Sequence, residues 1–397
     1  MATTIEGVAA VRGRLPRRGS ARRLAERAAR DALGAAGIGA DGVDLLLNAG
    51  LYRDRNLGEP ALAALIQEGV GAHPEDPRPG AHGTFSFDVA NGSCGVLTSL
   101  QIADGFLRSG TIRRALVVAS DADPGHGLAP GFPFPPWGAA AVVAGRDGPG
   151  GLAGFAWEAE PDEELFHATV GLDDDRDRFR GGNGRSRLRA ERGRDGLEGG
   201  SGRAGLGAER GRDRPEGERG RDGLGAERGR DGLESERGRD GLEGERGFNR
   251  VRGGRGRDRV RGGRGLDGLG IGRGGRGRGS NRLRIERRPE FGERAAALAA
   301  KAAARLLDRA GLRPDDLDLV IPGLLEPGFL DALPGLLAVP AGVVVRPPGG
   351  ARAHTAGLLV CLDAARDRPP AQRTLLLSAG AGLVAGAALL EGAPGAR

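Results

Sequence analysis

The chain has 397 residues, including 75 glycines and two cysteines, and its 59 basic and 53 acidic residues give a net charge of +6. The charge is uneven: residues 181–280 hold 26 arginines against 17 acidic residues, so the other 297 residues carry a net charge of −3. This acidic remainder argues against nucleic-acid binding by the whole protein. Two cysteines, Cys94 and Cys361, rule out a disulfide framework, and no Cys/His cluster has zinc spacing, so we expect no metal and no bound cofactor.

Apolar segments in the chain are too short or too interrupted to cross a membrane, which needs about 18 apolar residues. The first 23 residues also lack the apolar core of a secretory signal. We therefore expect a cytoplasmic protein without a membrane partner.

The first flank alternates between amphipathic helices and buried strands. Its expected elements are a helix at 20–36, strands at 43–47 and 85–89, a helix at 96–107, a strand at 115–119 and a Gly/Ala-rich strand from 137. The strands are apolar without polar alternation, which is typical of sheets covered on both faces. The flank is therefore expected to form a layered α/β unit.

A nine-residue repeat interrupts the chain after this flank. Glycines recur at Gly193, Gly202, Gly211, Gly220, Gly229, Gly238, Gly247, Gly256, Gly265 and Gly274. The unit E-R-G-R-D-G-L-x-x only partly overlaps the calcium-binding nonapeptide, because arginine fills its variable positions. Too few apolar residues are present to offset chain entropy, so we expect a disordered, low-complexity insertion at 174–282. Arg/Gly tracts near its end leave RNA binding open as a minority alternative.

The second flank repeats the order of the first. Its expected elements are a helix at 293–310, strands at 317–321 and 343–345, a helix at 358–366, a strand at 374–378 and an apolar strand from 383. The segments AAGIGADGVDLLL (35–47) and RAGLRPDDLDLVI (309–321) align without a gap. The chain is therefore predicted to be a duplication, with halves at 1–173 and 283–397 around the insertion.

The segment from Thr84 to Gly110 is the best candidate for a chemical site. A buried strand leads through a turn of small residues into a helix, which places Ser93 and Cys94 where free backbone N–H groups and the helix dipole stabilise an anion. Such a position suits a nucleophile and its oxyanion. Two simpler interpretations stay open: Ser93 as a helix N-cap and Cys94 as a small buried residue.

The same segment carries a family resemblance. FDVANGSCG, a helix ending in LRSG and the strand ALVVASDADP together resemble ketoacyl-ACP synthase III and its relatives in the thiolase superfamily. The resemblance covers most of both flanks and none of the repeat tract. It implies a duplicated thiolase-like αβαβα layered fold that pairs through its sheets into a dimer.

The resemblance also assigns roles to single residues, with departures from the family pattern. It places Ser93, rather than the neighbouring Cys94, at the nucleophile position. Gly323 stands where the family has a histidine, and His354 stands where it has an asparagine. The segment Gly380-Ala381-Gly382 resembles the glycine loop of the family, so the backbone amides of Ser93 and Ala381 are the expected oxyanion donors. His354 could equally be a loop histidine with local hydrogen bonds.

Two functions follow as hypotheses. The first is an acyltransferase of fatty acid or polyketide biosynthesis that takes an acyl thioester of coenzyme A or acyl carrier protein on Ser93, with His354 as base. Full condensation is doubtful because Gly323 removes one of the two side chains that stabilise the enolate in the family. The alternative is a catalytically silent thiolase-fold subunit that partners an active synthase in a heterodimer.

Overall fold

The computed structural model describes residues 1–13, 19–56, 58–72, 83–162, 164–171, 282–369 and 371–392. All but one of the residues of the expected insertion, 174–282, lie outside this part of the chain, so its boundaries and its lack of order stay predictions. Arg282 is the exception, and it begins a strand.

Among the residues that the structure describes, the first sheet contains five strands, all from the first flank. They are β1 (Ala2–Arg12), β2 (Leu45–Asn48), β3 (Phe85–Asp88), β4 (Arg114–Asp121) and β5 (Trp137–Arg146), in the order β1-β5-β4-β2-β3. Strand β2 runs parallel to β3 and β4, whereas β5 runs antiparallel to β4 and β1.

The central strands β2, β4 and β5 bury both faces of this sheet, as their apolar sequences predict. Helices α1 (Ala21–Ala36) and α2 (Leu62–Val70) cover one face, and α3 (Gly95–Arg108) covers the other. In β2 the side chain of Leu46 belongs to the α1 and α2 cluster, while Leu45 and Leu47 belong to the α3 cluster. This alternation of apolar side chains explains why no polar residue interrupts the strand.

The second sheet has the order β6-β11-β10-β9. It contains β6 (Gly151–Ala159), β9 (Leu319–Pro322), β10 (Arg373–Gly380) and β11 (Val384–Glu391). The expected strand at 343–345 is reduced to a single parallel bridge between Val320 and Val344. A 3-10 turn (Ala341–Val343) precedes the bridge and two prolines follow Arg346, and prolines lack the N–H that a longer ladder needs.

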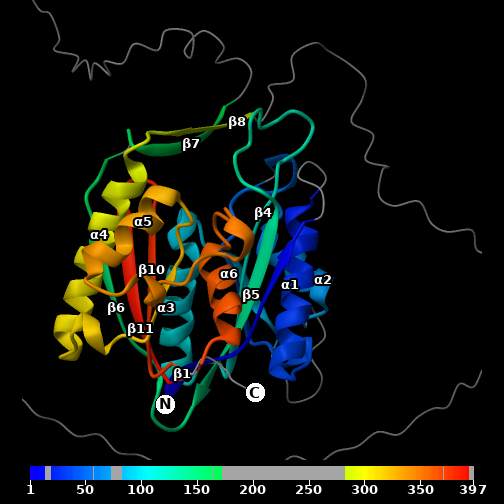
Figure 1. Cartoon of the computed structure of the whole chain (residues 1–397). Coiled ribbons are helices and arrows are strands. Elements are labelled where there is room, and N and C mark those ends of the chain that lie inside the picture. Colours follow the sequence, from blue (N-terminus) through cyan, green and yellow to red (C-terminus); the bar gives the residue numbers. More distant parts are fainter. Residues whose placement is uncertain are drawn as a thin grey trace, which may run out of the picture. The chain divides into compact units, whose positions relative to one another are not determined.

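Helix α4 (Phe291–Ala310) packs against the outer face of the second sheet, and α5 (Pro327–Leu337) packs against α4. Helix α6 (Gly357–Ala364) lies with α3 between the two sheets. Figure 1 shows the resulting layers: helices, sheet, central helices, sheet and helices. The order β1-β5-β4-β2-β3 matches β6-β11-β10-β9 followed by the Val344 bridge. The predicted αβαβα layered fold is confirmed.

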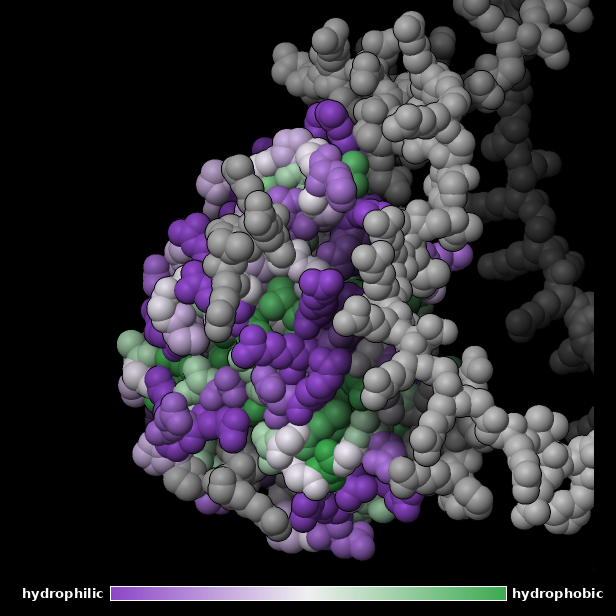
Figure 2. All heavy atoms as spheres, turned by 90° about the vertical axis from the view of Figure 1, so that its right-hand side faces the viewer, coloured by the Kyte–Doolittle hydropathy of each residue, from purple (hydrophilic) through white to green (hydrophobic). Residues whose placement is uncertain are grey.

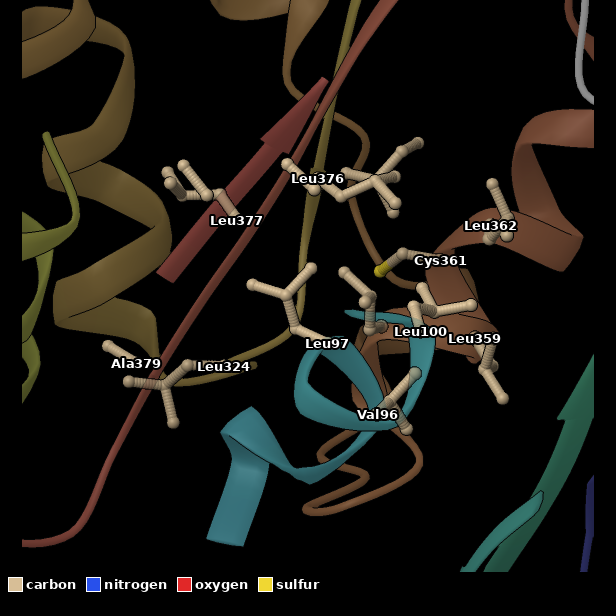
Figure 3. Packing of buried hydrophobic residues seen from close by; sticks show 14 of the residues in the cluster. Val96, Leu97, Leu100, Leu324, Leu359, Cys361, Leu362, Leu376, Leu377 and Ala379 are labelled. Carbon is tan, nitrogen blue, oxygen red and sulfur yellow. The ribbon is translucent and has the colours of Figure 1, made fainter. Parts of the chain in front are cut away.

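The central layer holds the core near the candidate site. Figure 3 shows Leu97 of α3 on the side of β10 and Leu359 on α6, and both are fully buried. On the side that carries α1 and α2, hydrophilic residues dominate the surface with hydrophobic areas between them (Figure 2). A separate hairpin, β7 (Phe166–Gly171) paired antiparallel with β8 (Arg282–Arg287), links the two halves.

Candidate functional site

Ser93 and Cys94 lie in a tight turn at the amino end of α3. Strand β3 ends at Asp88, a 3-10 turn covers Gly92–Cys94, and α3 begins at Gly95. Gly92 has a φ of 51°, in the left-handed region that favours glycine. A Cβ at Gly95 would lie 3.1 Å from the Cβ of Ala49, so glycine lets the helix end approach the end of β2. The predicted strand, turn and helix are therefore present.

Both side chains of this turn are buried, and both bond to backbone carbonyls of the second half. Ser93 is 1% exposed, and its Oγ donates a hydrogen bond to the carbonyl of Ala379. Cys94 is fully buried, with its Sγ 3.6 Å from the carbonyl oxygen of Val384. Burial raises the pKa of the Cys94 thiol to about 12, so it is not a thiolate at neutral pH. The choice of Ser93 over Cys94 as the nucleophile stays a prediction.

The loop between β10 and β11 lies directly against this turn. A Cβ placed on Gly380 would lie 3.5 Å from both Ser93 Oγ and Cys94 Sγ. The backbone nitrogen of Ala381 lies 3.9 Å from the corresponding position on Gly92. The two segments expected to supply oxyanion amides are therefore neighbours, and their role as donors stays a prediction.

His354 is buried in an aromatic cluster rather than exposed on a loop. It is 3% exposed, and its ring stacks on Phe134 with centroids 4.3 Å apart and on Tyr52 at 5.2 Å, while Phe166 meets it edge-on at 5.9 Å. Burial lowers the pKa of His354, although the nearby carboxylate of Asp121 acts in the opposite direction. The imidazole is therefore neutral at pH 7, and its buried Nε2 has no hydrogen-bond partner.

Asp121, at the end of β4, fixes the loop that carries His354. One carboxylate oxygen accepts hydrogen bonds from the backbone N–H and the hydroxyl of Thr355 at 2.7 and 2.6 Å. The other accepts from the backbone N–H of Tyr52 at 3.3 Å. Neither Asp121 nor the aromatic cluster was expected as part of a site. The acidic end of the apolar strand ALVVASD could have indicated Asp121, and the aromatic segment GFPFPPW could have indicated Phe134.

Gly323 has no room for the histidine of the family pattern. A Cβ on Gly323 would lie closer to Ser378 Oγ than the 3.0 Å that real Cβ atoms keep, and 3.4 Å from the Cβ of Leu358. A Cβ on Gly357 would in turn collide with the carbonyl oxygen of Gly323. The hydroxyl of Ser378, from the neighbouring strand, therefore fills the space where a side chain at 323 would begin.

The structure does not join Ser93 and His354 by a hydrogen bond, since the Ser93 hydroxyl donates to Ala379 and His354 Nε2 is unpaired. Their pairing in catalysis stays a prediction. Within the described ranges, no cluster of three or more His, Cys, Asp or Glu residues could hold a metal ion. In the same part of the chain, no helix is long and apolar enough to cross a membrane.

Comparisons with known proteins agree with this architecture. No protein-family model matches the chain. The β-ketoacyl-[acyl-carrier-protein] synthase III of Alkalilimnicola ehrlichii is 37% identical over 98 residues, which are 25% of this chain and 27% of that protein. The enzyme of the same name from Novosphingobium aromaticivorans is 38% identical over 98 residues, with the same shares of each chain. The matches thus span about a quarter of the length of these curated relatives.

Solved structures match over nearly the whole chain, at low identity. The 3-oxoacyl-[acyl-carrier-protein] synthase III of Aquifex aeolicus has a TM-score of 0.60 and 16% identity, covering 98% of this chain and 100% of that one. The priming β-ketosynthase of the R1128 polyketide pathway has a TM-score of 0.61 and 18% identity, covering 99% and 97%. OleA of Xanthomonas campestris, solved with lauric acid and lauroyl-CoA, has a TM-score of 0.61 and 14% identity, covering 98% and 99%.

The paired sheets around a central helical layer, with the Ser93 turn at the start of α3, match the fold of the solved ketoacyl-ACP synthase III structures. Over 98 residues the sequence is also similar to curated synthases of that name, so the resemblance predicted from the motifs is confirmed.

Proposed function

We propose that this protein is an acyltransferase of the ketoacyl-ACP synthase III type, which accepts the acyl group of a coenzyme A or acyl carrier protein thioester on Ser93. The names of the relatives, and the lauroyl-CoA bound to OleA, support this substrate class. The observation that carries the proposal is the buried, neutral imidazole of His354 with an unpaired Nε2, in a fold that sets Ser93 at a helix amino end.

The proposed acyl transfer needs no cofactor, because the thioester, Ser93 and His354 account for every bond and proton. Ser93 Oγ attacks the thioester carbonyl carbon, and its proton passes to His354 Nε2. The new Oγ–C bond replaces the C–S bond, and the proton then passes to the leaving thiolate. The acyl group next moves to a thiol, amine or hydroxyl of an acceptor. Since Ser93 and His354 are at most 3% exposed, the side chains that cover them must move to admit the substrate.

Acyl transfer is favoured over condensation, because Gly323 supplies no side chain to hold an enolate and Ser378 occupies the space where one would lie. The same observation supports the second candidate, a silent subunit that dimerises with an active synthase. The unpaired Nε2 of His354 favours the enzyme, since leaving a buried polar atom unpaired costs about 1–3 kcal/mol.

Labelling with radioactive acyl-CoA or acyl carrier protein thioesters of two, six and twelve carbons tests whether the protein is an acyltransferase or a silent subunit. The enzyme should form a protein-bound adduct that Ser93→Ala abolishes and that Cys94→Ala retains. An adduct that survives Ser93→Ala would transfer the role to Cys94. No adduct with any chain length, together with a second synthase that co-purifies with the chain, would establish the silent subunit.

A further inference from the structure

The hydroxyl of Ser378 is buried without a hydrogen-bonding partner. Ser378 is fully buried in β10, and its Oγ has no partner. Native proteins pair the large majority of buried polar side-chain atoms, and leaving one unpaired costs about 1–3 kcal/mol. An unpaired hydroxyl that lies beside a candidate site is therefore a donor available to a ligand.

This hydroxyl lies on the side of β10 that faces the candidate site. Side chains alternate along a strand, so Leu376, Ser378 and Gly380 share one face. Figure 3 shows Leu376 on the side of α6 and Leu377 on the opposite side. Gly380 faces Ser93 and Cys94, since its Cβ position lies 3.5 Å from both side chains. Ser378 is therefore about 7 Å along the strand from the residue that touches the nucleophile.

Ser378 also fills the space beside Gly323, the position where the family pattern has a histidine. A side chain at 323 and the hydroxyl of Ser378 exclude one another, because a Cβ on Gly323 would collide with Ser378 Oγ. Ser378 on β10 therefore places a hydroxyl beside Gly323, which follows β9 and has no side chain to form a hydrogen bond.

We propose that Ser378 binds the carbonyl oxygen of the acyl thioester through its hydroxyl, and so adds a side-chain donor from β10 to the backbone amides expected at Ser93 and Ala381. The inference rests on the proposed acyl transfer. Ser378 O–H donates to the carbonyl oxygen, on which negative charge grows as Ser93 attacks, and no bond to Ser378 forms or breaks. A fixed donor in a site that excludes water stabilises that charge more than water does.

Ser378→Ala and Thr374→Val provide the test and its matched control. Thr374 lies on the same face of β10, is fully buried and also has an unpaired hydroxyl. It is about 13 Å from Ser378 along the strand, on the side away from Gly380. Removal of either hydroxyl leaves no partner unpaired, so both variants should fold and melt at or above the temperature of the unaltered chain. Only Ser378→Ala should slow the acylation of Ser93, by about 10- to 100-fold.

A second readout does not depend on acyl transfer. A ketone analogue of acyl-CoA, in which CH2 replaces the thioester sulfur, keeps the carbonyl and cannot transfer it. Its dissociation constant should rise about tenfold in Ser378→Ala and stay unchanged in Thr374→Val. Equal affinity for the ketone in Ser378→Ala and the unaltered chain would overturn the role of Ser378, whether or not Ser93 is acylated. Absence of an adduct in the unaltered chain would instead overturn the proposed function.

Discussion

At the scale of single residues, burial decides which side chains can react. Cys94 carries the more reactive element, but its pKa of about 12 keeps it a neutral thiol. Ser93 is one residue away, and its hydroxyl bonds only to the carbonyl of Ala379. A hydroxyl needs a base to become a nucleophile, so the proposed acylation of Ser93 requires that His354 reach it.

The neutral state of His354 predicts a pH dependence of stability. Its pKa is lowered in the folded chain, while an imidazole in an unfolded chain has a pKa of about 6.5. The unfolded chain therefore binds the proton first as the pH falls, and the free energy of unfolding decreases below about pH 6.5. His354→Phe keeps a ring against Phe134 and removes the titration. Urea unfolding between pH 7.5 and 5.5 should show a steeper loss in the unaltered chain, by up to about 1.4 kcal/mol per pH unit.

The control for this experiment is a pair of unfolding curves at pH 8, where His354 is neutral in both the folded and the unfolded chain. There the two proteins differ only in how well the ring at 354 packs. Parallel pH profiles for the two proteins would show that the imidazole takes up a proton as readily in the folded chain as in the unfolded one.

At the scale of elements, the buried carboxylate of Asp121 joins the end of β4 to the loop before α6. Its three hydrogen bonds come from Thr355 and Tyr52, which lie in different halves of the sequence. They hold the segment that carries His354 against the first sheet. The position of the imidazole is therefore set by β4 as well as by its own loop.

Thr355→Val should lower the free energy of unfolding by about 1–3 kcal/mol, because the 2.6 Å hydrogen bond to Asp121 is lost while the shape of the side chain is kept. Urea unfolding measures the loss. Ser109→Ala removes an exposed hydroxyl and should change stability by less than about 0.5 kcal/mol. Equal effects of the two substitutions would mean that Asp121 does not depend on the Thr355 hydroxyl.

At the scale of the whole molecule, strands β7 and β8 flank the repeat tract in the sequence and pair with each other. Gly171 pairs with Arg282, so the residues on either side of 172–281 are already held together. A short turn can close an antiparallel pair of this kind. A chain in which four residues replace 172–281 should melt within about 2 °C of the full chain and keep its acylation. A loss of several degrees would show that the tract stabilises the fold.

The same shortened chain tests the minority RNA hypothesis. RNA binding through the Arg/Gly tract should disappear with it, and should weaken with salt in the full chain. Weak RNA binding that is equal in both chains would end that hypothesis.

The predicted dimer can be tested at β3, an edge strand of the first sheet among the described residues. Strand β3 ends the sheet order, and Phe85 on it is 60% exposed, beside Phe87. Exposed edge strands with apolar side chains are ready sites of association. Phe85→Glu should convert a dimer to a monomer in light scattering, while Leu336→Glu, at a residue 47% exposed on α5, should leave the mass unchanged. A monomeric unaltered chain would contradict the dimer.

Much of this fold was predictable from local pattern alone. The apolar strands without alternation, the capped helix after Ser20 and the matched order of the two flanks were sufficient for the layered duplication. Strands β1, β6, β7 and β8 and helices α2 and α5 were not predicted. The expected strand at 343–345 was wrong in extent, because neighbouring prolines limit it to one bridge.

The sequence by itself determined the layered fold, the duplicated order of elements and the placement of Ser93 at the amino end of a helix, because periodicity and turn residues act over short distances along the chain. Only the tertiary structure decided the environments of the reactive groups. The burial that keeps Cys94 protonated, the aromatic stack around His354 and the packing of Ser378 beside Gly323 all arise between residues far apart in the sequence. No local pattern encodes those contacts.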